Sequence, residues 1–236
     1  LTGGTGSQSD IRVRRASGVL AADASKCFSS TFFQDTFDID PPAGQLEVIP
    51  ETGFGGTLTV TVGSVPPDLT GTIAIDGPAG SLTTTKDGQN ASFTFTNSAL
   101  NQRAAFTLTS AAGVANYTIR RPDGTVLKNG GFITSEFTDV LILNQTGTWR
   151  VELDPSGTGF GTLTAQVASV PPDLSGTIVL DGPAGSLTTT KAGQNASFTF
   201  ANSVANQRAA FTLGDNSSTC TYDTNPHLER TAKRNG

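Results

Sequence analysis

The sequence contains few of the residues on which catalysis and metal binding depend. It has one histidine, two cysteines, one tryptophan and no methionine among 236 residues. A zinc site needs clustered cysteines and histidines, and a Ser-His-Asp or Cys-His site needs a histidine beside its partners. The one histidine, His227, lies in a polar, partly basic C-terminal stretch, where a solvated side chain is expected. We therefore predict that the protein is not an enzyme and has no catalytic, cofactor-binding or metal-binding residues.

Charged residues and long apolar runs are also scarce. Only 15% of the residues are charged, the net charge is −5, and the few basic residues are scattered, whereas nucleic-acid binding needs a concentrated basic patch. No run approaches the roughly 20 apolar residues of a membrane-spanning helix, so neither a nucleic-acid partner nor a membrane span is expected. The start, Leu1-Thr2-Gly3-Gly4, lacks the basic and apolar parts of a signal peptide. The composition favours an extracellular or cell-surface location, and the chain would then be a processed form or a fragment.

Several local features resemble functional sites but are better explained structurally. Asp38 and Asp40 fall on one face of an alternating strand, yet no oxygen-rich calcium loop follows them. Lys86 and Lys191 occupy equivalent positions, where solvated lysines near a turn are favoured over Lys-Asn isopeptide bonds. Five N-x-S/T sequons make glycosylation an open question, since several arise by chance in a chain rich in serine and threonine; they begin at Asn90, Asn116, Asn144, Asn195 and Asn216.

The chain does have alternating apolar and polar residues. The stretches 57–62 (TLTVTV) and 92–95 (SFTF) alternate threonine or serine with apolar residues, which puts one face of a strand in a core and the other in water. This pattern is typical of a β-sandwich or barrel. The single tryptophan, Trp149, lies in the alternating strand 149–153 and is expected to anchor the core.

The chain also repeats itself. Residues 57–108 match 162–213 at an offset of 105, with 42 of 52 positions identical, and residues from about 10 to 69 match about 117 to 174 more weakly. Two frames fit this repeat. One gives two whole domains, about 10–109 and 117–213, followed by a tail. The other cuts at the two Val-Pro-Pro-Asp-Leu segments and leaves one whole module between two half modules.

Three motifs inside one repeat distinguish the frames. They are Ala91-Ser92-Phe93-Thr94-Phe95 after Gly88-Gln89, the turn Arg121-Pro122-Asp123-Gly124-Thr125, and Thr146-Gly147-Thr148-Trp149-Arg150-Val151-Glu152-Leu153. In this order they resemble the bacterial pre-peptidase C-terminal domain and similar sandwich repeats of large secreted bacterial proteins. The resemblance implies the second frame, and a β-sandwich module that is structural or accessory and carries no catalytic residues.

We accordingly predict an all-β chain of tandem Ig-like, pre-peptidase-like sandwich modules, one complete and one split between the chain ends. Residues 1–69 would be the second half of a module, 70–174 a complete module, 175–213 a first half and 214–236 a tail. Alone, each half would expose sheet edges and apolar faces, but 176–213 followed by about 10–63 would rebuild a whole module.

This organisation suggests what the protein does. The termini of a tandem sandwich module usually leave from opposite poles, so the two halves would join between copies, and such a head-to-tail contact propagates. The predicted function is a subunit of an extracellular filament whose partners are identical copies. The alternative is an accessory sandwich module of a larger secreted protein, with a carbohydrate or surface glycan as its partner.

The two cysteines fit the split module. The repeat maps Cys220 back to Ala115 and Cys27 forward to Phe132 or Ile133. These positions flank the Asp123-Gly124 turn symmetrically, and symmetric positions across a hairpin face each other. A disulfide between Cys27 and Cys220 of two subunits is therefore predicted, although residues 1–9 and 214–222 map to the same place before the hairpin and compete for it.

Overall fold

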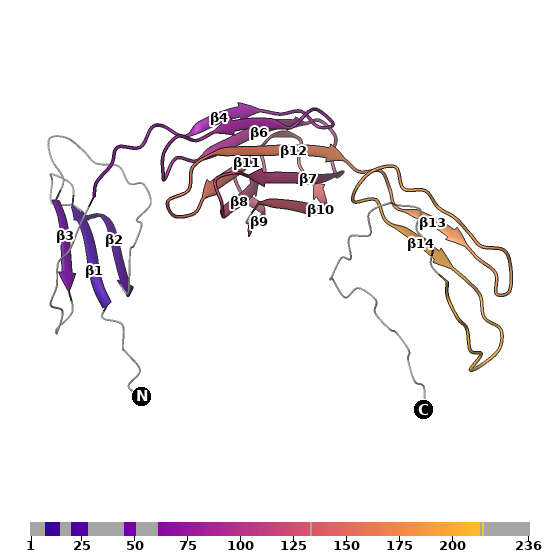
Figure 1. Cartoon of the computed structure of the whole chain (residues 1–236). Helices are drawn as coiled ribbons and strands as arrows, with labels where there is room; N and C mark the ends of the chain where they lie inside the picture. The colour runs from indigo at the N-terminus through magenta and orange to yellow at the C-terminus, as the bar shows by residue number, and fades with distance from the viewer. Residues whose placement is uncertain are drawn as a thin grey trace, which may run out of the picture.

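The computed structural model describes residues 8–14, 20–27, 45–50, 61–132, 134–212 and 214. Fourteen strands, and no helix, make up the regular structure of these residues, which confirms the predicted all-β sandwich fold. None of these residues belongs to a helix that could cross a membrane. The strands form three groups: an N-terminal sheet, a central sandwich and a C-terminal arm (Figure 1).

The central sandwich, residues 69–169, consists of two sheets. One has the strand order β4-β6-β11-β8-β9 and the other the order β10-β7-β12-β5. Their strands, in chain order, are β4 (Leu69–Thr72), β5 (Gly80–Thr83), β6 (Ala91–Asn97), β7 (Gln102–Ser110), β8 (Ala115–Arg120), β9 (Val126–Phe132), β10 (Ser135–Leu143), β11 (Gly147–Pro155) and β12 (Thr162–Ser169).

The alternation in the sequence decides which face of each strand is buried. On β6 the side chains of Phe93 and Phe95 point into the core, and on β11 those of Trp149 and Val151 do the same. The strand register pairs Trp149 with Phe95 and Val151 with Phe93. Trp149 is fully buried, and its ring stacks on Phe95 at a centroid distance of 6.3 Å. The core therefore forms around large apolar side chains, including the aromatic pair Trp149–Phe95, that face each other across neighbouring strands.

The turn predicted at residues 122–124 is confirmed, and it joins β8 to β9. Gly124 has a φ of 84°, which a glycine adopts without strain. The Asp123 carboxylate accepts hydrogen bonds from the backbone N–H of Thr125 (2.9 Å) and from Nε2 of Gln145 (2.7 Å). Hydrogen bonds from Thr125 and Gln145 stabilise the charged form and lower the pKa of Asp123 to about 2.

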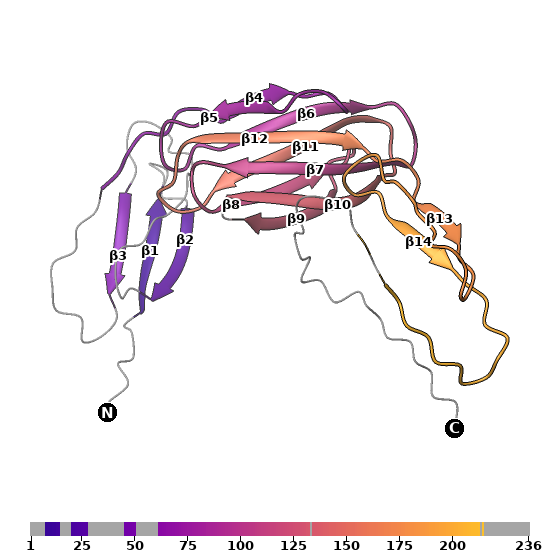
Figure 2. The ribbon, with the colours of Figure 1, turned by 45° about the vertical axis from the view of Figure 1, so that its right-hand side comes forward.

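Two smaller groups of strands flank the sandwich. The N-terminal sheet consists of β1 (Gln8–Arg14), β2 (Leu20–Cys27) and β3 (Gln45–Pro50), in the order β2-β1-β3. The C-terminal arm, residues 174–212, contains β13 (Leu174–Thr177) and β14 (Ala196–Thr199), which pair in parallel. Figures 1 and 2 show the sheet and the arm at opposite ends of the central sandwich.

Candidate assembly interface

The arm reproduces the first strands of the central sandwich. Leu174 pairs with Ala196 in the arm as Leu69 pairs with Ala91 in the sandwich, in the same parallel register. The supporting hydrogen bonds recur as well. Nε2 of Gln194 donates to the carbonyl of Pro172 at 2.7 Å, and its counterpart in the sandwich, Gln89 to Pro67, is also 2.7 Å. The near-identical sequences of these segments thus fold locally in the same way.

Among the residues that the structure describes, the arm lacks the partners that these strands have in the sandwich. There, four of the seven strand pairs join the first half of the module, β4 to β7, to the second half, β8 to β12; they are β6–β11, β5–β12, β7–β12 and β7–β10. Loop bonds join the halves too, as when the N–H of Asp76 donates to the carbonyl of Val167 at 2.9 Å. Within the described residues, the arm makes the bonds internal to a first half and none that corresponds to these.

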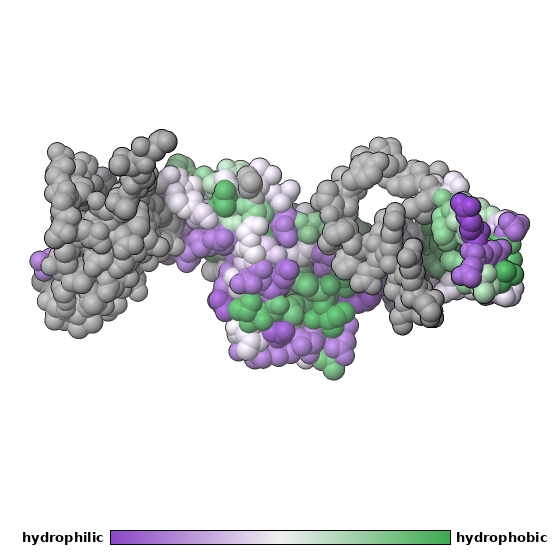
Figure 3. Space-filling model, turned by 90° about the horizontal axis from the view of Figure 1, so that it is seen from below, coloured by the Kyte–Doolittle hydropathy of each residue, from purple (hydrophilic) through white to green (hydrophobic). Residues whose placement is uncertain are grey.

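Aromatic side chains of the arm are exposed where their counterparts in the sandwich are buried. Phe200 and Phe211 pack on each other at 5.4 Å between ring centroids, much as their counterparts Phe95 and Phe106 do at 5.8 Å. The arm phenylalanines and their counterparts differ greatly in exposure: Phe198 37% against Phe93 1%, Phe200 43% against Phe95 2%, and Phe211 70% against Phe106 0%. Figure 3 shows apolar surface on the arm, at the right of the view, beside hydrophilic residues. The arm therefore holds two of these phenylalanines in contact, as in the sandwich core, but leaves all three exposed.

The N-terminal sheet corresponds to the other half. Its order, β2-β1-β3, matches β9-β8-β11 of the central sandwich, and β1 pairs with both neighbours antiparallel, as β8 does. In the sandwich, β11 continues to β6 and β4, whereas β3 has no second neighbour among the described strands. Val62, next to this sheet in sequence, is 69% exposed, although its counterpart Val167 is fully buried. The arm thus has the strand pairing of one part of the five-stranded sheet, and the N-terminal sheet has the strand order of the other part.

The structure describes only part of the predicted cysteine site. β2 ends at Cys27, and the register places Gln8 opposite it. The positions to which the repeat maps Cys220 and Cys27, Ala115 and Phe132, pair directly across β8 and β9. The remaining candidates of the sequence analysis lie outside the described residues; these are Cys220, His227, Asp38, Asp40 and Asn216.

The two equivalent lysines lie at the ends of the central sandwich. Nζ of Lys86 donates to the carbonyl of Ser64 at 3.3 Å. Nζ of Lys191 donates to Oγ of Ser169 at 3.3 Å and forms an ion pair with Asp76. In these contacts neither lysine meets an asparagine, so the contacts offer no partner for an isopeptide bond.

A second ion pair joins the arm to the sandwich, between Arg103 on β7 and Asp173 in the linker. The carboxylates of both ion pairs are stabilised in the charged form. The hydrogen bond from Lys191, followed by that from Ser169, lowers the pKa of Asp76. The backbone N–H of Asn195 and then Arg103 lower the pKa of Asp173. The sequence analysis missed both pairs, although the recurrence of the four charges at an offset of 105 was visible in it.

The described residues offer little to a small ligand. They contain no group of three or more His, Cys, Asp or Glu side chains that could hold a metal ion. A hollow of about 320 Å³ on the five-stranded sheet is lined by Asp68, Arg150 and Glu152 among others. A second, of about 310 Å³, lies where Lys191 of the arm meets Asp76 and Phe137 of the sandwich. Both are open to solvent and lined by mixed polar and apolar side chains, unlike the enclosed, mostly apolar sites of small molecules.

The comparisons with known proteins find similar solved structures but no match among family models or curated proteins. Among solved structures, the chain is similar to the pre-peptidase C-terminal domain of a collagenase from Bacillus anthracis, with a TM-score of 0.37 and 11% identity over 44% of this chain and 99% of that one. It is also similar to PliG, a periplasmic inhibitor of g-type lysozyme from Aeromonas hydrophila, with a TM-score of 0.29 and 9% identity over 42% of this chain and 98% of that one. The first belongs to the family that the sequence motifs resemble.

Proposed function

We propose that this protein is the subunit of an extracellular filament in which residues 176–213 of one copy and about 10–63 of the next fold together into one sandwich. Each copy would also contribute the complete module 70–174. The observation that carries the proposal is the complementarity of the two ends: the arm has the counterparts of β4 and β6, and the N-terminal sheet has those of β11, β8 and β9. Joined, they give the order β13-β14-β3-β1-β2, which matches the complete five-stranded sheet.

The second sheet of the sandwich makes the join tight. Its order, β10-β7-β12-β5, takes strands alternately from the second and first halves of the module. In a module shared by two copies, every strand of this sheet would therefore bond to the other copy. Each half would satisfy edge groups that a lone sheet leaves open, and this is the physical basis of strand addition.

The exposed apolar area of the arm supports the proposal of a strong contact. A phenylalanine side chain buries on the order of 200 Å², so the exposed fractions of Phe198, Phe200 and Phe211 amount to about 300 Å². At about 25 cal/mol per Å², their burial would contribute ~7 kcal/mol before the cost of ordering the two chains.

The arrangement of the ends favours a filament over a closed dimer. The arm and the N-terminal sheet extend from opposite ends of the central sandwich (Figure 1), so one copy has its two halves apart. A copy with one donor end and one acceptor end makes heterologous contacts, and these continue unless a rotation closes them into a ring.

The cysteines would lie close together in such a joined module. The pairing of Ala115 with Phe132 in the complete module gives the expected geometry for Cys220 of one copy opposite Cys27 of the next. Gln8 competes for this place, because it already lies opposite Cys27 in the N-terminal sheet. The bond would thus require the start of β1 to move aside, and it would form in the oxidising surroundings outside a cell.

Two truncated chains test the proposal. The 236-residue chain should form filaments visible by negative-stain electron microscopy. A chain lacking 1–63 and a chain lacking 175–236 should each stay monomeric, because each keeps only one half. Mixed, they should form a 1:1 complex that grows no further, as measured by sedimentation velocity. Filaments from either truncated chain alone, or a 236-residue chain that stays monomeric, would contradict the proposal, and glycan binding by that monomer would favour the accessory-module alternative.

A further inference from the structure

Two ion pairs fix the arm to the central sandwich. Asp76, at a φ of 61°, presents its carboxylate to Lys191 and accepts hydrogen bonds from the N–H (3.1 Å) and Oγ (2.5 Å) of Ser169. Arg103 pairs with Asp173, which follows the paired prolines of the linker. One acid and one base of the sandwich thus meet one base and one acid of the segment that follows it.

The repeat places a second set of four charges one module away. Asp181 and Arg208 on the arm are the counterparts of Asp76 and Arg103, and Lys86 and Asp68 are the counterparts of Lys191 and Asp173. The local geometry is already in place on both sides. Asp181 has a φ of 58°, close to that of Asp76, and Lys86 reaches back across the linker to Ser64 as Lys191 reaches Ser169.

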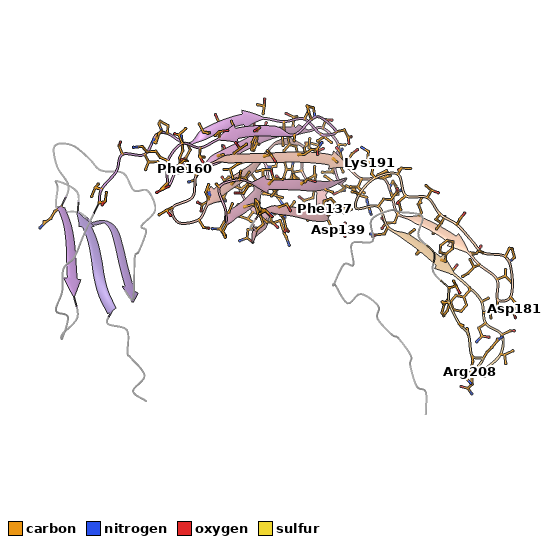
Figure 4. All side chains as sticks on the ribbon, viewed as in Figure 1. Phe137, Asp139, Phe160, Asp181, Lys191 and Arg208 are labelled. Carbon is orange, nitrogen blue, oxygen red and sulfur yellow. The ribbon has the colours of Figure 1, made fainter. Side chains whose placement is uncertain are left out.

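This second set is incomplete within one chain. Asp181 and Arg208 are exposed on the outer part of the arm (Figure 4), and neither has an ion-pair partner among the described residues. Lys86 and Asp68 lie at the opposite end of the central sandwich, beside the linker from the N-terminal sheet. The arm thus carries one acid and one base, and the opposite end of the molecule carries the base and the acid that would match them.

We propose that Asp181 and Arg208 of one copy form ion pairs with Lys86 and Asp68 of the next copy. The inference rests on the proposed function, because only a second copy that completes the split module brings these charges together. The pairs repeat between copies the contact that Asp76, Arg103, Lys191 and Asp173 make within a copy. Every contact between successive modules of the filament then has the same geometry. The structural repeat of the filament is therefore one module, and each subunit contributes two such repeats.

The order of charges also selects the partner. The arm presents an acid and a base, and the receiving end presents a base and an acid in the matching order. A shifted register between the same two ends would bring like charges face to face, and their repulsion disfavours that register. The partner of these charges is thus the end of an identical copy.

Zero-length cross-linking tests the pairing directly. A carbodiimide activates a carboxylate, and the amine of an ion-paired lysine displaces the activating group to form an amide. An equal mixture of ¹⁵N-labelled and unlabelled chains is polymerised, cross-linked, digested and analysed by mass spectrometry. We expect Lys86–Asp181 peptides that combine one labelled and one unlabelled chain, and Lys191–Asp76 peptides from single chains. The sequences around the two pairs differ at residues 74, 75 and 87 against 179, 180 and 192, so their masses are distinct.

The outcomes separate this inference from the proposed function. Filaments that yield the Lys191–Asp76 product but no Lys86–Asp181 product would overturn the ion pairs and leave the filament proposal standing. A chain that forms no filaments would overturn both.

Charge reversal provides a second measurement on the same chain. Asp181→Lys and Lys86→Asp should each raise the concentration needed for polymerisation about tenfold, since each replaces an exposed attraction with a repulsion. The double variant should return to near the original concentration. Lys128→Asp, the control, reverses an exposed charge on β9 of the central sandwich and should leave that concentration within about twofold. Equal effects of the three single variants, or no recovery in the double variant, would contradict the inference.

Discussion

Phe211 provides the sharpest test of the split module, because the chain contains its own control. The side chain of Phe211 is 70% exposed, whereas its counterpart Phe106 is fully buried in the central sandwich. The same substitution, to alanine, therefore acts on an open half-core at one position and on a closed core at the other. The two variants should differ in which property they change.

The expected magnitudes follow from these exposures. About 140 Å² of the Phe211 side chain remains to be covered, so its loss should weaken association by ~3 kcal/mol, or about 100-fold in the concentration needed for polymerisation. The free energy of unfolding of the dilute monomer should change by under ~1 kcal/mol. Phe106→Ala should instead lower that free energy by ~3–5 kcal/mol, as for a phenylalanine removed from a packed core.

The assays are light scattering across a concentration series for polymerisation and urea unfolding of dilute protein, followed by tryptophan fluorescence. Trp149 is the only tryptophan and lies in the central core, so its signal reports on the sandwich and not on the arm. The reasoning is refuted if Phe211→Ala polymerises at the original concentration, or if it lowers the stability of the sandwich as much as Phe106→Ala does.

Two further expectations follow from the cysteines and from Tyr117. Denaturing electrophoresis of filaments without reductant should give a ladder of covalent oligomers that collapses to monomer on reduction, and Cys27→Ser should abolish the ladder; monomer in both lanes would exclude the inter-subunit bond. Burial, with a smaller contribution from Glu136, raises the pKa of Tyr117 to about 12. The folded state thus keeps the phenol proton where the unfolded chain loses it. The stability from this neutral phenol is complete below pH 10 and is lost as the pH rises from 10 to 12, by up to roughly 3 kcal/mol. Tyr117→Phe should remove this loss, as measured by urea unfolding at each pH.

The parts of the fold that were predictable from the sequence are local. The alternation of Phe93 and Phe95 sets which face of β6 is buried, and the Pro122-Asp123-Gly124 turn fixes the β8–β9 hairpin, including the pairing of Ala115 with Phe132. A two-residue period and a turn type depend only on neighbours in the chain. For this reason both could be derived without knowing the rest of the structure.

The partners of strands far apart in the chain could not be derived in this way. The parallel pairing of β4 with β6 and the interleaved order β10-β7-β12-β5 are set by how the two sheets close over a shared core, and alternation does not encode them. The ion pairs of Asp76 with Lys191 and Arg103 with Asp173 depend in turn on this tertiary arrangement. The repeat predicted two complementary halves, and the sheet order adds the strand-by-strand correspondence on which the proposed function rests.

The near identity of the two first halves leads to a last expectation. Residues 57–108 and 162–213 share 42 of 52 positions, so the arm of one copy could compete with residues 70–108 for the central sandwich of another. The resident half is tethered to its partner strands, and a tether of this kind gives an effective concentration in the millimolar range. An arm in solution at micromolar concentration should therefore bind only the untethered N-terminal half.

A fluorescently labelled chain lacking residues 1–63, added to growing filaments, should then cap one end and shorten the filaments in proportion to its mole fraction. Label at a single end of each filament in fluorescence microscopy agrees with this expectation. Label spread along the filament would show that arms also enter complete modules. The tether would then not be what distinguishes a complete module from one shared by two copies.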